Sequence, residues 1–172
     1  TYAQLKDFAD KVNGGESFEG KNIKLEVNVD LGSDSNPWTS IGTAKATSFK
    51  GNFDGGNHVI SGLYINGSDS NVGFFGYVDG GTVENLTVEG NVEGSKSVGG
   101  VIGYLNVGTV KNCGNKARVK GGSMVGGVVG AVNGDCTVSG CYNSGSVIGT
   151  SGYIGGVTGQ HWRAGLVENC YN

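Results

Sequence analysis

Carboxylates are the residues of this chain that could carry acid–base chemistry, and Asp54 in the segment FDGGN is the best single candidate. A glycosidase needs two carboxyl groups that face each other across a cleft. Glu84 and Glu168 share a repeat position but lie three repeats apart, and the other acids occupy scattered positions. An aspartate before glycine is also common in turns. We therefore interpret Asp54 as a turn residue and predict that the chain is not an enzyme.

Metal and cofactor chemistry has little support in the sequence. The two histidines, His58 and His161, do not form the H-E-x-x-H pair of zinc peptidases. The chain has no G-x-S-x-G elbow and no nucleotide-binding loop in a strand-to-helix setting. The acidic loop at residues 30–34 gives some support for calcium, but the nonapeptide pattern of calcium-binding β-rolls is missing. We predict no metal and no cofactor.

Three of the four cysteines, Cys113, Cys141 and Cys170, occupy one repeat position and should stack at the spacing of neighbouring strands. That spacing falls within the range of disulfides, but parallel Cβ vectors would aim the sulfurs poorly. We therefore predict stacked, buried free thiols that act as small apolar side chains. Cys136 lies outside the column, and the sequence gives it no partner.

Aromatic side chains are the candidates for ligand binding, because exposed rings can stack on sugars or dock a protein partner. Tyr77 and Tyr104 share a repeat position and could form a short strip. The alternative is that the tyrosines lie against neighbouring loops and that Trp162 covers the end of the core. The candidate binding residues are Trp38, Tyr77, Tyr104, His161, Trp162 and Arg163.

These side chains must be positioned by a repeat. The phrases VGFFG, VGGVIG, VGGVVG and IGGVTG begin at Val72, Val98, Val125 and Ile154, at spacings of 26, 27 and 29 residues. Repeats of this length stack on their neighbours to bury an apolar side. Since short β-branched runs alternate with glycine or asparagine, the pattern predicts an all-β fold: a parallel β-helix, or solenoid, with about three short strands per coil.

Two columns within the repeat have a clear structural meaning. One column contains only glycine and asparagine, the residues that most readily adopt positive φ, and we predict a corner of the coil there. The next column is apolar and should point inward. The corner residues are Gly62, Asn85, Asn112, Gly140 and Asn169, and the inward residues are Leu63, Leu86, Cys113, Cys141 and Cys170.

Residues 1–48 differ from the repeats at 49–172, and we predict that they form an N-terminal cap. Leu5, Phe8, Ala9 and Val12 have helical spacing, so we expect a short capping α-helix over residues 2–13. Alternating apolar residues predict one half-buried strand over residues 22–31, followed by a loop. The chain ends within a copy of the repeat, which leads us to expect a fragment of a longer protein.

The charge balance excludes some partners. Twelve basic and fifteen acidic residues give a net charge of −3, which offers no basic field for nucleic acid. No apolar run is long enough to span a membrane, so we predict no membrane insertion. A signal peptide is also absent, which fits an excised mature segment of an extracellular protein.

The segment FKGNFDGGNHVISGLYI at residues 49–65, followed by the VGG units, resembles bacterial surface proteins with GLUG repeats. The leading helix and Trp38 before Ile41-Gly42 agree with that pattern, so the resemblance covers nearly the whole chain. It implies a secreted or cell-surface protein. Such repeats also occur in adhesin-like proteins and beside the catalytic region of metallopeptidases that cleave immunoglobulin A. The family supplies no shared ligand residues.

Two functions therefore stay open. The first is a non-catalytic extracellular scaffold, adhesion or binding module, whose partner is a host glycoprotein, a polysaccharide or a neighbouring domain of the same chain. The second is a carbohydrate-active β-helix, since β-helices also serve as polysaccharide lyases and hydrolases, or a substrate-recognition domain of a secreted immunoglobulin A peptidase.

Overall fold

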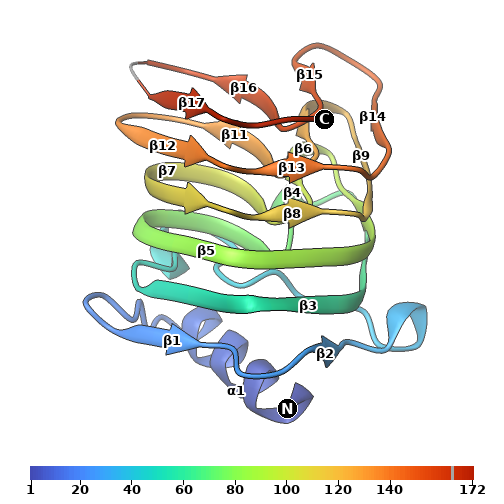
Figure 1. The fold of residues 1–172 in the computed structure, drawn as a ribbon. Helices are drawn as coiled ribbons and strands as arrows, with labels where there is room; N and C mark the ends of the chain where they lie inside the picture. The colour runs from blue at the N-terminus through green and yellow to red at the C-terminus, as the bar shows by residue number, and fades with distance from the viewer. Residues whose placement is uncertain (164) are drawn as a thin grey trace.

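The structure, a computed structural model, describes residues 1–163 and 165–172. It confirms the predicted fold class, a parallel β-solenoid of about five coils with an N-terminal helix. The coils stack along one axis in Figure 1, with the N-terminus at the bottom and the C-terminus at the top. Neighbouring coils pair in parallel, as between β3 (Asn52–Asn66) and β5 (Phe75–Glu93).

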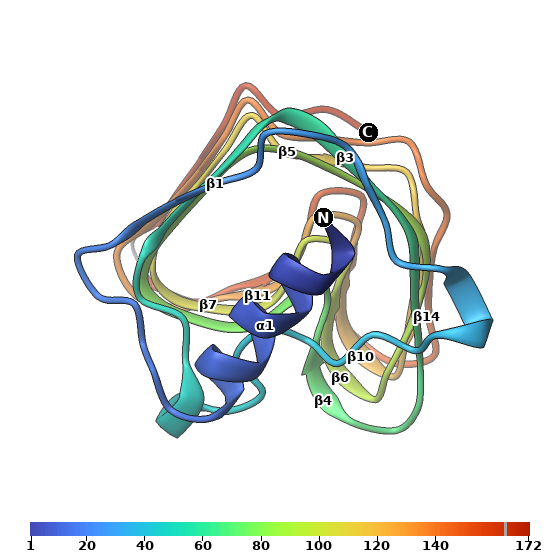
Figure 2. The same cartoon turned by 90° about the horizontal axis from the view of Figure 1, so that it is seen from below.

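Helix α1 (Tyr2–Asn13) lies across the open lower end of the solenoid (Figure 2). Thr1 and Gln4 form a capping box that satisfies the first backbone N–H groups of the helix. Its buried face packs on the first coils, where the Phe8 ring lies 5.7 Å from Phe49 and 6.0 Å from Phe53. The buried residues are those that the helical spacing predicted: Leu5, Phe8, Ala9 and Val12.

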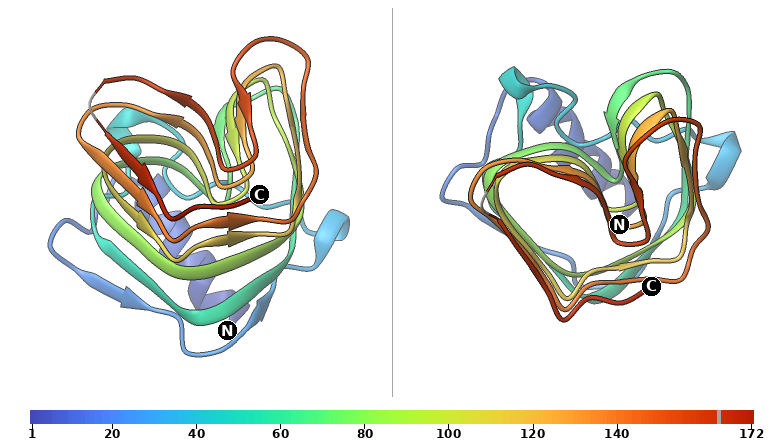
Figure 3. Two further views of the ribbon diagram at one scale, coloured as in Figure 1. Left: turned by 45° about the horizontal axis from the view of Figure 1, so that its top comes forward. Right: turned by 90° about the horizontal axis from the view of Figure 1, so that it is seen from above.

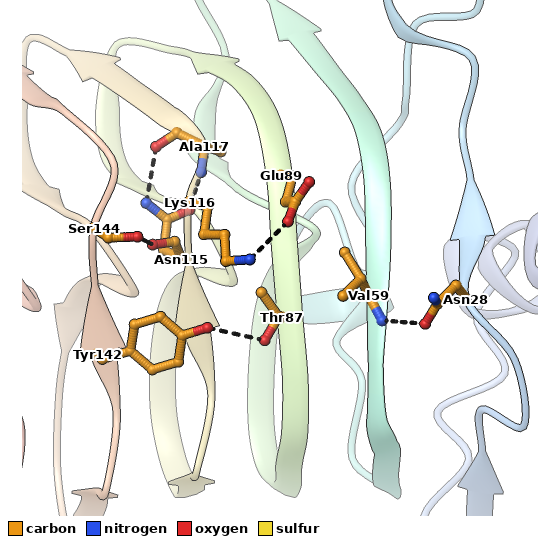
Figure 4. A network of polar contacts seen from close by, with 9 residues as sticks. All are labelled: Asn28, Val59, Thr87, Glu89, Asn115, Lys116, Ala117, Tyr142 and Ser144. Atoms are coloured by element: carbon orange, nitrogen blue, oxygen red, sulfur yellow. Dashed lines mark hydrogen bonds and ion pairs between the residues drawn. The ribbon is translucent and has the colours of Figure 1, made fainter.

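The prediction of one strand over residues 22–31 is wrong in extent. Two short strands, β1 (Asn22–Lys24) and β2 (Val29–Asp30), pair with separate parts of β3 as the lowest rung of the sheet. Between them the chain turns a corner, where the Val59 N–H donates to the side-chain oxygen of Asn28 at 2.9 Å (Figure 4). This corner ends the alternation, and Val27 is 53% exposed.

Later coils divide into shorter strands as the chain winds upward, whereas β3 and β5 each run through several corners. Two short 3₁₀ turns, η1 (Ser33–Ser35) and η2 (Lys45–Thr47), belong to the lowest coil. The remaining strands are β4 (Ser70–Val72), β6 (Lys96–Gly99), β7 (Ile102–Lys111), β8 (Gly114–Asn115), β9 (Arg118–Gly121), β10 (Ser123–Gly126), β11 (Val129–Val132), β12 (Cys136–Ser139), β13 (Tyr142–Asn143), β14 (Val147–Gly149), β15 (Ile154–Gly155), β16 (Thr158–His161) and β17 (Leu166–Glu168).

The predicted corner column is present in four coils, where Asn85, Asn112, Gly140 and Asn169 have φ between 51° and 61°, in the left-handed region. The prediction is wrong for Gly62 and Leu63, because Val83 pairs with Phe53 whereas Ile60 pairs with Val88, so these two residues lie at another position of the coil. Gly62 also has a positive φ of 65°, but it turns a different corner. A second column with φ between 54° and 66° precedes the VGG phrases: Asn71, Ser97, Met124 and Tyr153. Three of these four residue types carry no signal of that conformation, so the second corner could not be read from the sequence.

Each coil after the first has a lobe that the sequence did not predict. Strands β4, β6, β10 and β15 stack as a separate four-stranded sheet along one side of it. The chain then folds inward and leaves along β5, β7, β11 or β16 (Figure 3). The two arms of this inward fold add to the three predicted faces, so the coil has more than three. We call the part of each coil that contains β4, β6, β10 or β15 and the inward fold the lobe.

The VGG glycines form the inward fold because the two arms approach closely. A Cβ at Gly99 would clash with the carbonyl oxygen of Ile102, and one at Gly103 would clash with the backbone of Val72. The same relations recur one coil later at Gly126 and Gly130. A side chain at any of these positions would force the backbones apart.

Side chains form ladders between coils at both buried and exposed positions. Asn115 donates to Asn143 at 2.7 Å, and Asn143 donates to Asn172 at 2.6 Å. Asn115 also bonds both the N–H and the carbonyl of Ala117, while Lys116 pairs with Glu89 at 3.0 Å on the surface (Figure 4). Asn115 and Asn143 are almost fully buried, so these amides replace the apolar contacts of an ordinary core.

Candidate functional site

An aromatic strip, contributed by three coils, lies along the arm by which the chain leaves the inward fold. Tyr77 on β5 and Tyr104 on β7 occupy the same register, and their rings stack with centroids 4.8 Å apart at 25°. The Trp162 ring lies 6.2 Å from Tyr104, tilted by 45°. All three side chains are half-buried. The structure therefore brings together three of the six predicted binding residues, and we call Tyr77, Tyr104 and Trp162 the aromatic strip.

Trp162 reaches Tyr104 because a small residue stands between them. The register continues from Tyr104 to Ala131 and then Gln160, and Ala131 is fully buried. Trp162 follows β16 directly, and its backbone N–H donates to the Val132 carbonyl at 2.9 Å. The indole thus lies toward Tyr104 across the position of Ala131, on the outside of the coil rather than over the end of the core.

On the front of the coils, another large ring packs over a small residue of the coil below. The Tyr142 ring lies over Gly114, where a Cβ would clash with it, and its hydroxyl meets the Thr87 hydroxyl at 3.3 Å (Figure 4). Tyr171 stacks on Tyr142 with ring centroids 5.6 Å apart. A large ring over a small residue of the coil below is therefore a recurrent way in which this fold covers its surface.

An amide ladder runs beside the aromatic strip. Asn133 donates to Asn106 and Asn106 donates to the Asp79 carboxylate, each at 2.8 Å. These residues follow the strip positions by two along β5, β7 and β11. Hydrogen bonds between neighbouring amides fix their orientation, so the strip is bordered by a rigid row of polar groups.

Burial sets the protonation of the two tyrosines. Desolvation is the main cause that raises the pKa of Tyr77 to about 12, and it also raises the pKa of Tyr104. The positive charge of Arg163 opposes part of the rise in the pKa of Tyr104. Both phenols therefore stay neutral at physiological pH and can donate and accept hydrogen bonds.

The stacking limits what the strip can bind. The facing sides of the Tyr77 and Tyr104 rings cover each other, so their edges and hydroxyls remain for a ligand. Gln160, in the same column, has a buried side-chain oxygen without a hydrogen-bond partner among the described residues. The Gln160 oxygen is too buried for a ligand to reach, so the strip offers ring edges and two phenols, a set suited to a ligand with hydroxyl or N–H groups.

His161 and Arg163 flank Trp162 in the sequence, but their side chains are exposed, whereas that of Trp162 is half-buried. His161 takes the register position of Val132 and Leu105, which are fully buried in lower coils, yet His161 is exposed. Arg163 is exposed with φ of 69°, in the left-handed region. The sequence therefore grouped three neighbours that the coil directs to different places.

Trp38, one of the candidate binding residues, lies outside the aromatic strip and is almost fully buried. It is 5% exposed, stacks on Phe74 at 5.5 Å, and donates its indole N–H to the Phe74 carbonyl at 3.1 Å. The lowest coil has no lobe of its own, so Trp38 fills the space beneath the first one. Only an edge of the indole reaches a surface cavity.

Asp54 is held as a structural acceptor. It accepts from the Gly56 N–H at 2.9 Å and from the Asn85 amide at 3.0 Å, and Asn112 extends that ladder at 3.2 Å. The Asn85 hydrogen bond is the largest cause that lowers the pKa of Asp54, followed by Gly56 and then by Lys24. An ionised carboxylate with these partners terminates an amide ladder, which agrees with a turn role.

The cysteines are free thiols in the structure. Cys113 and Cys141 are fully buried in the inward column, and Cys170 is half-buried in the last coil. Burial raises the pKa of Cys113, and it raises that of Cys136 to about 11. Cys136 donates to the Asn133 carbonyl at 2.9 Å, beside the amide ladder. Across residues 1–163 and 165–172, no group of histidine, cysteine and acidic residues could hold a metal ion.

Comparison with known proteins supplies one structural likeness. Neither a family model nor a curated protein matches the chain. Among solved structures, it superposes on one titled as a "putative immunoglobulin A1 protease" from Bacteroides ovatus, with a TM-score of 0.67 and 21% identity. The two chains share a fold. The match covers 95% of this chain and 61% of that one, so this chain spans less than two thirds of its length.

The part of the chain that the structure describes has no helix long and apolar enough to cross a membrane. Its single α-helix, α1, covers the lower end of the solenoid instead.

Proposed function

We propose that this chain is a non-catalytic repeat module of an extracellular bacterial surface protein, which serves as a rigid scaffold and binds a partner through the aromatic strip. The observation that carries the proposal is the contiguity of Tyr77, Tyr104 and Trp162, contributed by three coils and bordered by the Asp79–Asn106–Asn133 ladder. Stacked coils hold such a row at fixed spacing, which limits the loss of conformational entropy on binding.

A host glycoprotein or a polysaccharide fits the strip best. Both offer hydroxyl groups to the phenols and apolar C–H edges to the rings. The resemblance to GLUG-repeat surface proteins supports an extracellular setting. The net charge of −3 gives no support for nucleic acid as a partner.

A glycan array and immobilised immunoglobulin A, probed with the wild-type chain and with Trp162→Ala, test the proposal. We expect loss of at least tenfold in affinity for Trp162→Ala, because aromatic anchors dominate such interfaces. Tyr171→Ala is the matched control, since Tyr171 is an exposed ring outside the strip. Equal loss in both variants, or no binding by the wild type, would reject the strip as the binding surface.

The second candidate is a substrate-recognition domain of a secreted immunoglobulin A peptidase. The likeness to the Bacteroides structure favours it, because that protein is named for this substrate. Binding of immunoglobulin A1 without cleavage would support this candidate. Release of product from immunoglobulin A or from any polysaccharide by the isolated chain would reject the non-catalytic role.

A further inference from the structure

A cavity of about 380 Å³ lies beneath the first lobe, where the lowest coil has no lobe of its own. In Figure 2 the segment 36–41 passes directly under β4 and β6 instead of following the outward path of the later coils. Residues 37–43 form the floor of the cavity, and residues 65–72 with Glu93 form its roof and wall. It shares no residue with the aromatic strip.

The floor is fixed by hydrogen bonds to the coil above. The Trp38 backbone N–H donates to the Tyr64 carbonyl, and the Ser40 hydroxyl donates to the Gly73 carbonyl, each at 2.8 Å. The Trp38 indole is locked on Phe74 by stacking and by its own hydrogen bond. The cavity is therefore preformed, which reduces the cost of ordering the site when a ligand binds.

The lining combines an apolar wall with polar groups, three of which have no hydrogen-bond partner among the described residues. Trp38, Ile65 and Val72 supply the apolar part. The three polar side chains are those of Thr39 and Asp69, which are exposed, and of Asn71, which is half-buried, so water solvates them in the free protein. Small-molecule sites have this composition, and the volume falls at the lower end of the range of about 300–1,000 Å³ that such sites occupy.

The charge of the lining selects the class of ligand. Asp69 and Glu93 are acidic, Glu93 is paired with Lys120 at 2.6 Å, and none of the described lining residues is basic. A carboxylate only accepts hydrogen bonds, whereas the Thr39 hydroxyl and the Asn71 amide both donate and accept. The carboxylates disfavour an anionic ligand, whereas the hydroxyl groups of a neutral ligand could bond the side chains of Asp69, Asn71 and Thr39.

We propose that this cavity binds a neutral saccharide of one or two rings, independently of the aromatic strip. Its hydroxyls bond Asp69, Asn71 and Thr39, and its C–H face lies against Ile65 and the exposed edge of Trp38. An extended peptide is disfavoured, because the edge strand β4 spans three residues and Ser40 already bonds both the N–H and the carbonyl of Gly73 next to it.

Nuclear magnetic resonance of the two indole N–H groups tests the proposal, because Trp38 reports the cavity and Trp162 reports the strip. The probes are the methyl glycosides of galactose, glucose, mannose and N-acetylgalactosamine, with glucuronic and N-acetylneuraminic acids as charged counterparts. We expect at least one neutral glycoside to shift the Trp38 signal with a Kd on the order of 1 mM, as for other small ligands. The acids should leave it unchanged.

Two substitutions separate the cavity from the rest of the fold. Gly67→Leu should abolish the Trp38 shift by occlusion, since the nearest atom to a Cβ there is 4.0 Å away and the fold can accept it. Gly152→Leu, in the lobe of the last coil with nothing within 4 Å, is the matched control and should bind normally. Asp69→Asn should weaken binding roughly tenfold, as expected for a lost hydrogen bond to a charged group.

Four other experimental outcomes would overturn the proposal. Absence of a Trp38 shift at roughly ten times the expected Kd would reject the site. A response that survives Gly67→Leu but disappears in Trp162→Ala would place sugar binding on the strip and leave the proposed function intact. A stronger response to the acids would reject the selection for neutral ligands. Shifts of β4 amides by an unrelated extended peptide, with none by glycosides, would assign the edge to strand addition.

Discussion

The side chain of Asn143 occupies the space that a Cβ at Gly127 would need. The same relation links Asn115 with Gly100 and Asn172 with Gly156. In the preceding coil, Phe74 and Val88 replace the glycine and the asparagine at the corresponding positions. The second glycine of each VGG phrase therefore makes room for an asparagine of the buried amide ladder. The two positions change together: one coil has the apolar pair Phe74 and Val88, and three later coils have a glycine and an asparagine.

Gly127→Ala should destabilise the fold by about 3 kcal/mol, because the added methyl group would clash with Asn143 and with the carbonyl oxygen of Gly156. Gly152→Ala is the control and should change stability by less than about 0.5 kcal/mol, since nothing lies within 4 Å of its Cβ. Urea unfolding followed by circular dichroism measures both. Equal midpoints would show that the inward fold adapts to a side chain.

Asn143→Ala should cost about 2–4 kcal/mol, because it removes a buried amide and leaves the Gly145 N–H and one N–H of the Asn115 amide without a partner. Asn106→Ala breaks a similar ladder at a half-exposed position, where water can replace the amide, and should cost less than about 1 kcal/mol. Thermal unfolding of the two variants compares them directly. A larger loss for Asn106 would contradict the role of burial.

Asp54 should make the fold sensitive to acid. Its folded pKa is lowered, so its contribution is complete above the ordinary value of 3.8 and is lost as the pH falls through the folded value. Asp54→Asn should remove this part of the pH dependence. Asn85→Gly, which keeps the positive φ but removes the main hydrogen bond, should reduce it. Unfolding midpoints between neutral and strongly acidic pH test both expectations.

Cys170 should react first with a thiol reagent in the native protein, because it is half-buried while the other cysteines are buried. Burial raises the pKa of Cys170 as well as those of Cys113 and Cys136, so the prediction rests on the exposure of the Cys170 thiol. Cys170→Ser should remove the fast phase. In denaturant the wild type should titrate as four thiols, and a smaller number would reveal a disulfide.

Tyr77 should ionise near its raised pKa of about 12. Because the neutral phenol is favoured in the native state, this group supports stability fully below pH 10, and that support declines as the pH rises from 10 toward 12. Spectrophotometric titration of the wild type and of Tyr77→Phe tests this. The variant should lack the late phase of phenolate formation and lose less stability in alkali.

Much of the fold could be predicted because each requirement repeats in every coil. A corner needs positive φ whichever coil it is in, so Asn85 and Gly140 appear in one column. The inward column is apolar for the same reason, and the helical spacing of Leu5 and Phe8 identified the cap. The second corner was missed because Ser97 and Met124 adopt positive φ without residue types that favour it.

The candidate site was predicted only in part. Tyr77 and Tyr104 share a repeat position, so their stacking follows from the period. The burial of Trp38 was not predicted because it depends on the missing lobe of the lowest coil, and the buried role of Asn115 was missed because the complementary glycine lies in another coil. Both depend on contacts between residues far apart in the chain.

By itself, the sequence determined the solenoid, one corner column, the apolar inward column and the capping helix, because those follow from local backbone and burial requirements repeated at a fixed period. Only the tertiary structure decided which residue of one coil lies on which residue of the next. That stacking places Trp162 across Ala131 against Tyr104, packs glycine against asparagine inside the coil, and leaves a cavity beneath the first lobe. Such contacts are fixed by the inward fold and by side-chain volume in adjacent coils, which no single repeat contains.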